Sequence, residues 1–186
     1  MLEGYPKTVN LRDGTVLTLR PMTRDDEYAI YIYFSSLPEE SRQYLRNDVT
    51  NRKLIERWMR ELNYEKSLPI LAEYEGHIVA NVTLHRQTFG WGLHVGEVRI
   101  TIDPNFRGKG LGLKLLGEIS ELAANSGLKK LVARVVTARS DVMKTFERCG
   151  YNRAAVLKKY VKDIYQNYAD IAIMVKELLP GMSGCE

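Results

Sequence analysis

The sequence is poor in cysteine and has no long apolar run. Its 186 residues include two cysteines, Cys149 within a helical pattern and Cys185 in the last few residues. We therefore expect no disulfide framework, and Cys149 fits a buried structural thiol better than a nucleophile. No apolar run approaches the roughly 18 residues of a membrane helix, and the N-terminus lacks the apolar segment of a signal peptide. These absences predict a cytoplasmic protein in a reducing compartment, with no membrane partner.

Histidine is also scarce. His77, His85 and His94 show no metal-ligand spacing, so we expect no metal cofactor. The net charge is only +4, and the basic residues are scattered instead of forming a stripe interleaved with aromatics. Nucleic acid is therefore not expected as a partner. The modest positive charge suits an anionic cofactor, and equally well ordinary solubility.

The length and even composition of the chain favour one domain over residues 1–186, because no repeat, low-complexity segment or linker divides it. In the first third of the chain, the residue pattern predicts a hairpin over 9–20 with its turn at Asp13-Gly14. Three short helices should follow, with start signals at Thr23, Ser36-Leu37-Pro38-Glu39 and Thr50.

The remainder alternates strand-like and helix-like patterns. Strands are predicted over 69–74, 77–84, 95–102, 131–136, 154–161 and 169–175, and helices over 109–125 and 140–149. Gly127 and Gly150 are placed to end the two helices. The order predicts an α/β fold of the α+β type, a twisted mixed sheet with helices on both faces.

A basic glycine-rich loop joins the predicted strand 95–102 to the predicted helix 109–125. It reads Arg107-Gly108-Lys109-Gly110-Leu111-Gly112-Leu113. Glycines let backbone N–H groups converge on a ligand, and a helix N-terminus with two cations favours a pyrophosphate. A Walker A loop does not occur, and a dinucleotide fingerprint would need glycine at Leu113. A turn that merely requires positive φ angles stays open as an alternative.

The loop also carries a family resemblance. Arg107-Gly108-Lys109-Gly110-Leu111-Gly112 fits in full the Arg/Gln-x-x-Gly-x-Gly/Ala signature of the GNAT superfamily of N-acetyltransferases. Phe146-Glu147-Arg148-Cys149-Gly150-Tyr151 resembles the second conserved stretch of that family. The resemblance runs from Leu17 to the last strand. More weakly, residues 11–42 are similar to GNAT domains of bacterial protein-lysine acetyltransferases.

This resemblance implies an enzyme that moves an acetyl group from acetyl-CoA to a primary amine by direct attack in a ternary complex. The strand before the loop would hold the pantetheine arm, and the loop N–H groups would hold the pyrophosphate. The implied cofactor residues are Ile100, Thr101, Ile102, Arg107, Gly108, Lys109, Gly110, Leu111, Gly112, Leu113 and Phe146. The acceptor is either a small molecule or a protein lysine or N-terminus, and a homodimer stays open.

Two residues are candidate bases for the amine proton. Glu97 lies close to where the family often has a glutamate, and His94 is the second candidate. Phe146 stands where many members have the tyrosine that protonates the thiolate, so Tyr151, Tyr160 and Tyr165 are open substitutes. This departure leaves a non-catalytic acyl-CoA-binding regulator as the alternative function, with a module for another phosphorylated ligand as a third.

Overall fold

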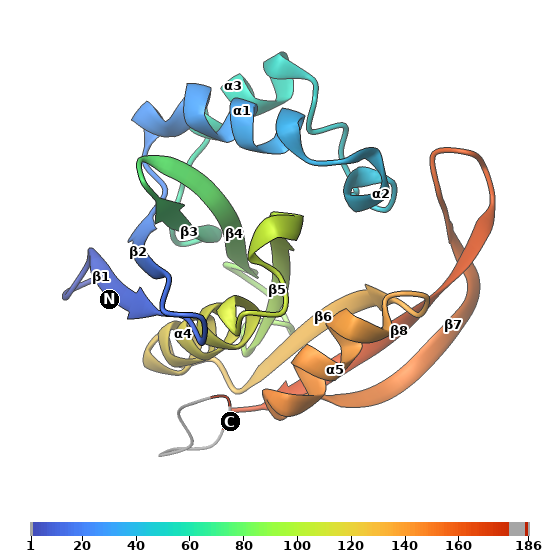
Figure 1. Ribbon diagram of the computed structural model, residues 1–186. Helices are drawn as coiled ribbons and strands as arrows, with labels where there is room; N and C mark the ends of the chain where they lie inside the picture. The colour runs from blue at the N-terminus through green and yellow to red at the C-terminus, as the bar shows by residue number, and fades with distance from the viewer. Residues whose placement is uncertain (1, 179–184, 186) are drawn as a thin grey trace.

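The computed structural model describes residues 2–178 and 185 (Figure 1). Eight strands form one mixed sheet in the order β1-β2-β3-β4-β5-β6-β8-β7. The strands are β1 (Lys7–Asn10), β2 (Val16–Pro21), β3 (Ser67–Tyr74), β4 (His77–Arg86), β5 (Val95–Ile102), β6 (Lys130–Val136), β7 (Asn152–Lys162) and β8 (Tyr168–Glu177). The helices are η1 (Arg24–Asp26), α1 (Glu27–Ser36), α2 (Glu39–Arg42), α3 (Arg52–Arg60), η2 (Pro104–Phe106), α4 (Leu111–Asn125) and α5 (Ser140–Arg148). The predicted mixed sheet is confirmed.

Local turn and cap chemistry accounts for most of these boundaries. Glu75 and Gly76 have φ angles of 48° and 79°, the left-handed pair of a two-residue hairpin turn between β3 and β4. The Thr23 start is confirmed by a capping box with Asp26. The prediction that Thr50 caps α3 is wrong by one residue. The Asn51 side chain accepts from the Lys53 N–H, and the Thr50 hydroxyl donates to Asp48.

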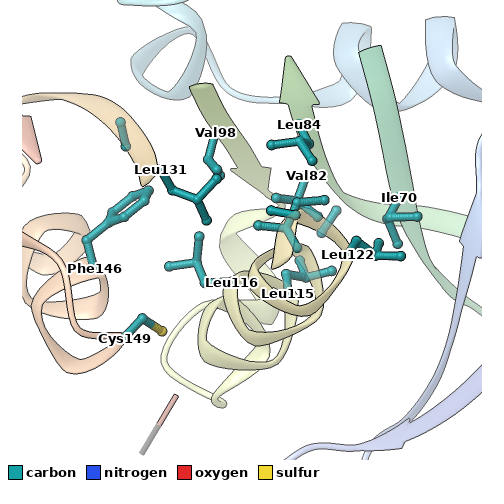
Figure 2. Packing of buried hydrophobic residues seen from close by; sticks show 14 of the residues in the cluster. Ile70, Val82, Leu84, Val98, Leu115, Leu116, Leu122, Leu131, Phe146 and Cys149 are labelled. Carbon is teal, nitrogen blue, oxygen red and sulfur yellow. The ribbon is translucent and has the colours of Figure 1, made fainter. Parts of the chain in front are cut away.

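The helices cover the two faces of the sheet, with α1–α3 on one face and α4 and α5 on the other (Figure 1). Each face has its own hydrophobic core. Figure 2 shows the larger core, in which leucines of α4 such as Leu115 and Leu116 point toward Val82, Val98 and Leu131 of the central strands. On the opposite face, the core includes Ile30, Phe34 and Ile55 of α1 and α3. Strands β3 and β4 contribute to both cores, with Leu71 and Ile78 in the smaller one, because side chains along a strand point to opposite faces of the sheet.

Strands β5 and β6 separate part-way along their length (Figure 1). They pair in parallel only over Val95–Glu97, whereas β5 pairs with β4 as far as Ile102. The Asp103 N–H donates to the Val79 carbonyl on the β4 side. Since backbone direction alternates along an antiparallel strand, Val98, Ile100 and Ile102 turn their N–H and C=O groups toward the gap. The gap therefore exposes strand-like hydrogen-bonding groups.

The two cysteines correct a prediction. Cys149 is buried, as expected, but its sulfur is bonded to that of Cys185 instead of being a free thiol. Cys185 lies against α4, where its backbone nitrogen would lie 3.7 Å from a Cβ on Gly117. Spacing could not predict this pairing, because it depends on where the tertiary structure places the two cysteines. Within the described residues, every helix is too short or too polar to cross a membrane.

Candidate active site

A groove of about 270 Å³ lies where β5 and β6 separate. Most of the cofactor residues expected from the sequence line it. They are Ile100, Thr101, Ile102, Arg107, Gly108, Gly110, Gly112, Leu113 and Phe146. Lys109 and Leu111 are different. The Lys109 ammonium pairs with Asp13 at 3.0 Å, and the Leu111 side chain is buried in the core.

Two glycines of the loop have positive φ angles, which the alternative of a turn that requires such angles also predicts. Gly108 and Gly110 have φ angles of 74° and 92°, and Gly110 is the N-cap of the 15-residue helix α4. Helix α4 therefore begins two residues later than predicted, because a residue at such a φ is not helical. Gly112 lies against α5, where a Cβ would come within 3.1 Å of the Thr145 methyl group. The loop thus directs the positive end of α4 at the groove.

Arginines make the groove basic. Arg107 donates from Nε to the Ile102 carbonyl at 3.0 Å and from Nη2 to the Ser41 hydroxyl at 2.8 Å. Burial, with repulsion from Arg139, lowers the pKa of the Arg107 guanidinium from its ordinary value. Arg12, Arg139 and Arg148 also line the groove. Arg12 lies in the turn after β1, whereas Arg139 and Arg148 lie at the two ends of α5, and no local pattern marked any of them as a neighbour of the loop.

A larger cavity of about 750 Å³ adjoins the groove on the face that carries α1–α3. The two share lining residues, among them Ile100, Thr101, Arg139 and Phe146. The larger cavity also has walls from α1, α3, β4, β5 and β6, and from β7 and β8. A cofactor in the groove would therefore present its reactive end to a second ligand in this cavity.

Glu97 lines this larger cavity, and its carboxylate forms ion pairs with three arginines. Its Oε1 is 2.8 Å from Arg46 Nη2 and 3.2 Å from Arg99 Nε. Its Oε2 is 3.3 Å from Arg134 Nη1. Glu97 and Arg99 both line the cavity. Arg46, from the loop after α2, and Arg134, on β6, were not predicted.

His85 is a further lining residue that the sequence did not single out. It pairs with Glu97 across β4 and β5, and its Nδ1 lies 2.8 Å from the Ser67 hydroxyl oxygen. Burial, followed by repulsion from Arg99, lowers the pKa of His85 to about 4. The register of β4 against β5 brings it to the site. That register could not be predicted, because the lengths of both strands around the 87–94 connection were unknown.

His94, the second candidate base, lies elsewhere. It is on the exposed turn before β5, and it is not among the residues that line the groove or the larger cavity. Its backbone carbonyl accepts from the N–H groups of Lys129 and Lys130. The structure therefore brings Glu97 to the site without His94.

The tyrosines also differ in position. Tyr160 is 61% exposed and lines the larger cavity. Tyr151 is buried in the core against Phe146, and burial raises the pKa of its hydroxyl. The Tyr165 hydroxyl donates to Glu39 and does not line either cavity. Of the three open substitutes for the family's tyrosine, Tyr160 is the one at the site.

Comparison with known proteins agrees with this geometry. A relative from Bacillus subtilis (strain 168), named as the phosphinothricin acetyltransferase YwnH, is 27% identical over 159 residues, covering 83% of this chain and 94% of the relative. A crystal structure named for a phosphinothricin N-acetyltransferase aligns with a TM-score of 0.75 at 25% identity, over 88% of this chain and 99% of that chain. The acetyltransferase yncA of Salmonella typhimurium, whose structure holds its cofactor acetyl-CoA, shares the fold with a TM-score of 0.75 at 18% identity, over 90% and 96% of the two chains.

The model of the acetyltransferase (GNAT) family matches residues 29–151. That range contains β5 with Glu97, the glycine loop and Phe146. Among the described residues, no group of histidine, cysteine, aspartate and glutamate is placed to hold a metal ion. The chain belongs to the GNAT family of N-acetyltransferases, which use acetyl-CoA.

Proposed function

We propose that residues 1–186 act as one N-acetyltransferase domain that transfers the acetyl group of acetyl-CoA to a primary amine of a small molecule. The observation that carries this proposal is the junction of two cavities at the gap between β5 and β6. The narrow one has the charge and backbone donors for a pyrophosphate. The wide one adjoins it and has room for an acceptor. Such an arrangement suits direct transfer between two bound reactants.

The residues of the groove fit the parts of acetyl-CoA. The N–H groups from Gly108 to Leu113 and the start of α4 would hold the pyrophosphate, with Arg107 beside them. The backbone groups of Ile100 and Ile102 that face the gap would pair with the amides of the pantetheine arm, as an added strand does. A further N–H on this strand would donate to the thioester oxygen as negative charge develops there.

Proton transfer in the wide cavity would fall to Glu97. An ammonium acceptor must lose one proton before its nitrogen attacks the thioester carbon. Glu97 Oε2 has one arginine contact and Oε1 has two, so Oε2 has more free acceptor capacity. As the C–N bond forms and the C–S bond breaks, the thiolate of CoA leaves. Tyr160 or water would supply the proton that it takes up.

A small acceptor is favoured over a folded protein. The cavity that holds Glu97 is bounded by helical segments on one side and by the β7–β8 hairpin on the other. The names of the B. subtilis relative and of one aligned crystal structure also refer to a small amine. Both observations support an acceptor that enters the cavity as a whole molecule.

Calorimetric titration with acetyl-CoA is the first test, with CoA, ATP and NAD as competitors. We expect saturable binding of acetyl-CoA that CoA competes for and that ATP and NAD leave unchanged. Release of the CoA thiol with small amines should follow. Absence of binding to acetyl-CoA and CoA at millimolar concentrations would overturn the proposal. Binding with no turnover of any amine would instead favour the non-catalytic acyl-CoA-binding regulator.

A further inference from the structure

The arginines around Glu97 come from three separate parts of the chain. Arg46 follows α2, Arg99 lies on β5, and Arg134 lies on β6 beyond the last β5–β6 pair. All three contact the same carboxylate, at 2.8, 3.2 and 3.3 Å. One carboxylate balances only one of the three positive charges. The cluster therefore places an excess of positive charge on the wall of a cavity, where it would attract an anionic ligand.

The remaining charges of the cavity do not remove this excess. Its lining also contains the acids Glu40 and Glu61 and the bases Lys66 and Arg139. Two acids against two bases add no net negative charge. His85 faces Glu97 from β4, and burial lowers its pKa to about 4, so it is neutral near pH 7. Repulsion from Arg99 and Arg134 likewise contributes to the lowered pKa of Arg46, after the larger effect of burial.

The guanidinium groups also have donors to spare. Each of the three contacts Glu97 through a single nitrogen, although an arginine carries five N–H donors. Their side chains are 41%, 39% and 42% exposed, compared with 24% for Glu97. A ligand in the cavity can therefore reach them without displacing Glu97. Planar, forked donors of this kind match a carboxylate or a similar oxyanion.

The cluster is also close to the expected reaction centre. Arg99 is two residues from Thr101, which lines both the groove and the larger cavity, so about 7 Å separates them along the strand. A small molecule can span this distance with an anionic group at one end and an amine at the other. A cationic polyamine or a lysine side chain would instead bring positive charge to a positive cluster.

We propose that Arg46, Arg99 and Arg134 form an anion-binding subsite, and that the acceptor is a small amine that carries a carboxylate, as an amino acid does. The proposal rests on the proposed acetyltransferase function and adds the chemical class of its acceptor. It excludes polyamines and lysine side chains as preferred substrates. The subsite would hold the carboxylate while the amine of the same molecule reaches the thioester.

Matched acceptors test this proposal on the intact protein. Free amino acids and their carboxamides share the amine and the side chain but differ in the carboxylate. We expect the acids to have kcat/KM values at least about tenfold above those of the amides, the usual worth of a charged hydrogen bond. Spermidine and a lysine peptide should be poorer still. Phosphonate and sulfonate analogues of the amino acids show whether the subsite requires a carboxylate or accepts any oxyanion.

Arginine variants test whether the three-arginine cluster causes the preference for acids over amides. Arg46→Gln, Arg99→Gln and Arg134→Gln should each raise the KM of the acids by about tenfold, leave that of the amides nearly unchanged, and leave acetyl-CoA affinity intact. Arg153→Gln, an exposed position on β7 outside both cavities, is the control and should behave like the wild-type protein. Urea unfolding of each variant separates loss of the subsite from loss of the fold.

The outcomes separate this proposal from the function on which it rests. Failure to bind acetyl-CoA would overturn the proposed function itself. With acetyl-CoA bound, equal or better turnover of amides, spermidine or the lysine peptide would overturn the anion subsite alone. If no amine is acetylated, calorimetric titration of the same amino acids into the CoA-loaded protein tests the subsite by binding alone. Binding of no acid there would also overturn the subsite.

Discussion

Glu97 on β5 and Arg134 on β6 contact each other at 3.3 Å, just where the two parallel strands lose their backbone pairing. The last residue pair between these strands is Glu97 with Val132. Beyond this pair, β5 and β6 have no paired residues, and the Glu97–Arg134 ion pair links the two strands through their side chains. The same separation that opens the cofactor groove therefore brings charged groups from both strands to one cavity.

Glu97→Gln should lower kcat by about a hundredfold, the ordinary contribution of a general base, with little change in acetyl-CoA affinity. The deficit should shrink as the pH approaches the pKa of the acceptor amine, because an unprotonated amine needs no base. Steady-state kinetics over pH measures both effects. Glu177→Gln, which removes a carboxylate paired with Lys130 at 2.6 Å, is the control. A deficit that stays constant with pH would contradict the role of a base.

Tyr160→Phe should lower kcat by about tenfold if its hydroxyl protonates the departing thiolate. Tyr165→Phe is a matched control on the same hairpin, because that hydroxyl bonds Glu39 away from both cavities. Release of CoA thiol is the measurement. Equal rates for both variants would indicate that water, and not Tyr160, protonates the departing CoA thiolate.

Gly110→Ala should lose about 1 kcal/mol of stability, because alanine is strained at a φ of 92°. It should also weaken acetyl-CoA binding by about tenfold, since strain in the loop redirects its N–H groups. Gly127→Ala at φ 80°, near the opposite end of α4, is the control with the same kind of strain. Calorimetry should show weaker binding only in Gly110→Ala. Equal affinities in the two variants would refute the assignment of the loop.

His85 predicts a pH dependence of stability. Its pKa is lowered to about 4 by burial and neighbouring arginines, whereas an unfolded histidine has a pKa near 6.5. Between these values the unfolded chain binds the extra proton, so the contribution of His85 is complete above pH 6.5 and is lost as the pH falls toward 4. Relative to His85→Asn, the wild-type protein should lose about 2 kcal/mol over that range, after allowance for solvent screening.

Urea unfolding at several pH values measures this difference. His77→Asn serves as the control, because His77 is exposed at the start of β4. Parallel stability curves for the wild-type protein and His85→Asn would show that His85 has the same pKa in the folded and unfolded chains, and would contradict the lowered pKa.

The Cys149–Cys185 disulfide should stabilise the fold by about 4 kcal/mol, as expected for a crosslink between residues 36 positions apart. Reduction with dithiothreitol should lower the free energy of unfolding by that amount. Cys185→Ser removes the crosslink but keeps the buried Cys149 sulfur in the core, so it should match the reduced wild-type protein and be insensitive to the reductant. An unchanged free energy of unfolding on reduction would contradict a stabilising crosslink.

Local sequence patterns predicted most of the helices and strands, and they marked the glycine loop as a candidate cofactor site. Turn and cap residues such as Glu75-Gly76, Thr23 and Gly150 act over a few positions, so their structures can be read locally. The loop from Arg107 to Leu113 combines glycines, cations and a helix start within seven consecutive residues, and its chemistry needs little beyond them.

Only the tertiary structure decided which distant side chains share the site. Arg46, His85 and Arg134 reach Glu97 through the path after α2, the register of β4 and the separation of β5 from β6. Cys185 reaches Cys149 in the same non-local way, and Lys109 turns from the groove because Asp13 lies beside it. Sequence patterns act over a turn of helix or a few strand positions, whereas register and chain path are set by packing of the whole sheet. The candidate cofactor loop could therefore be proposed from the sequence, whereas the cluster of arginines around Glu97 could not.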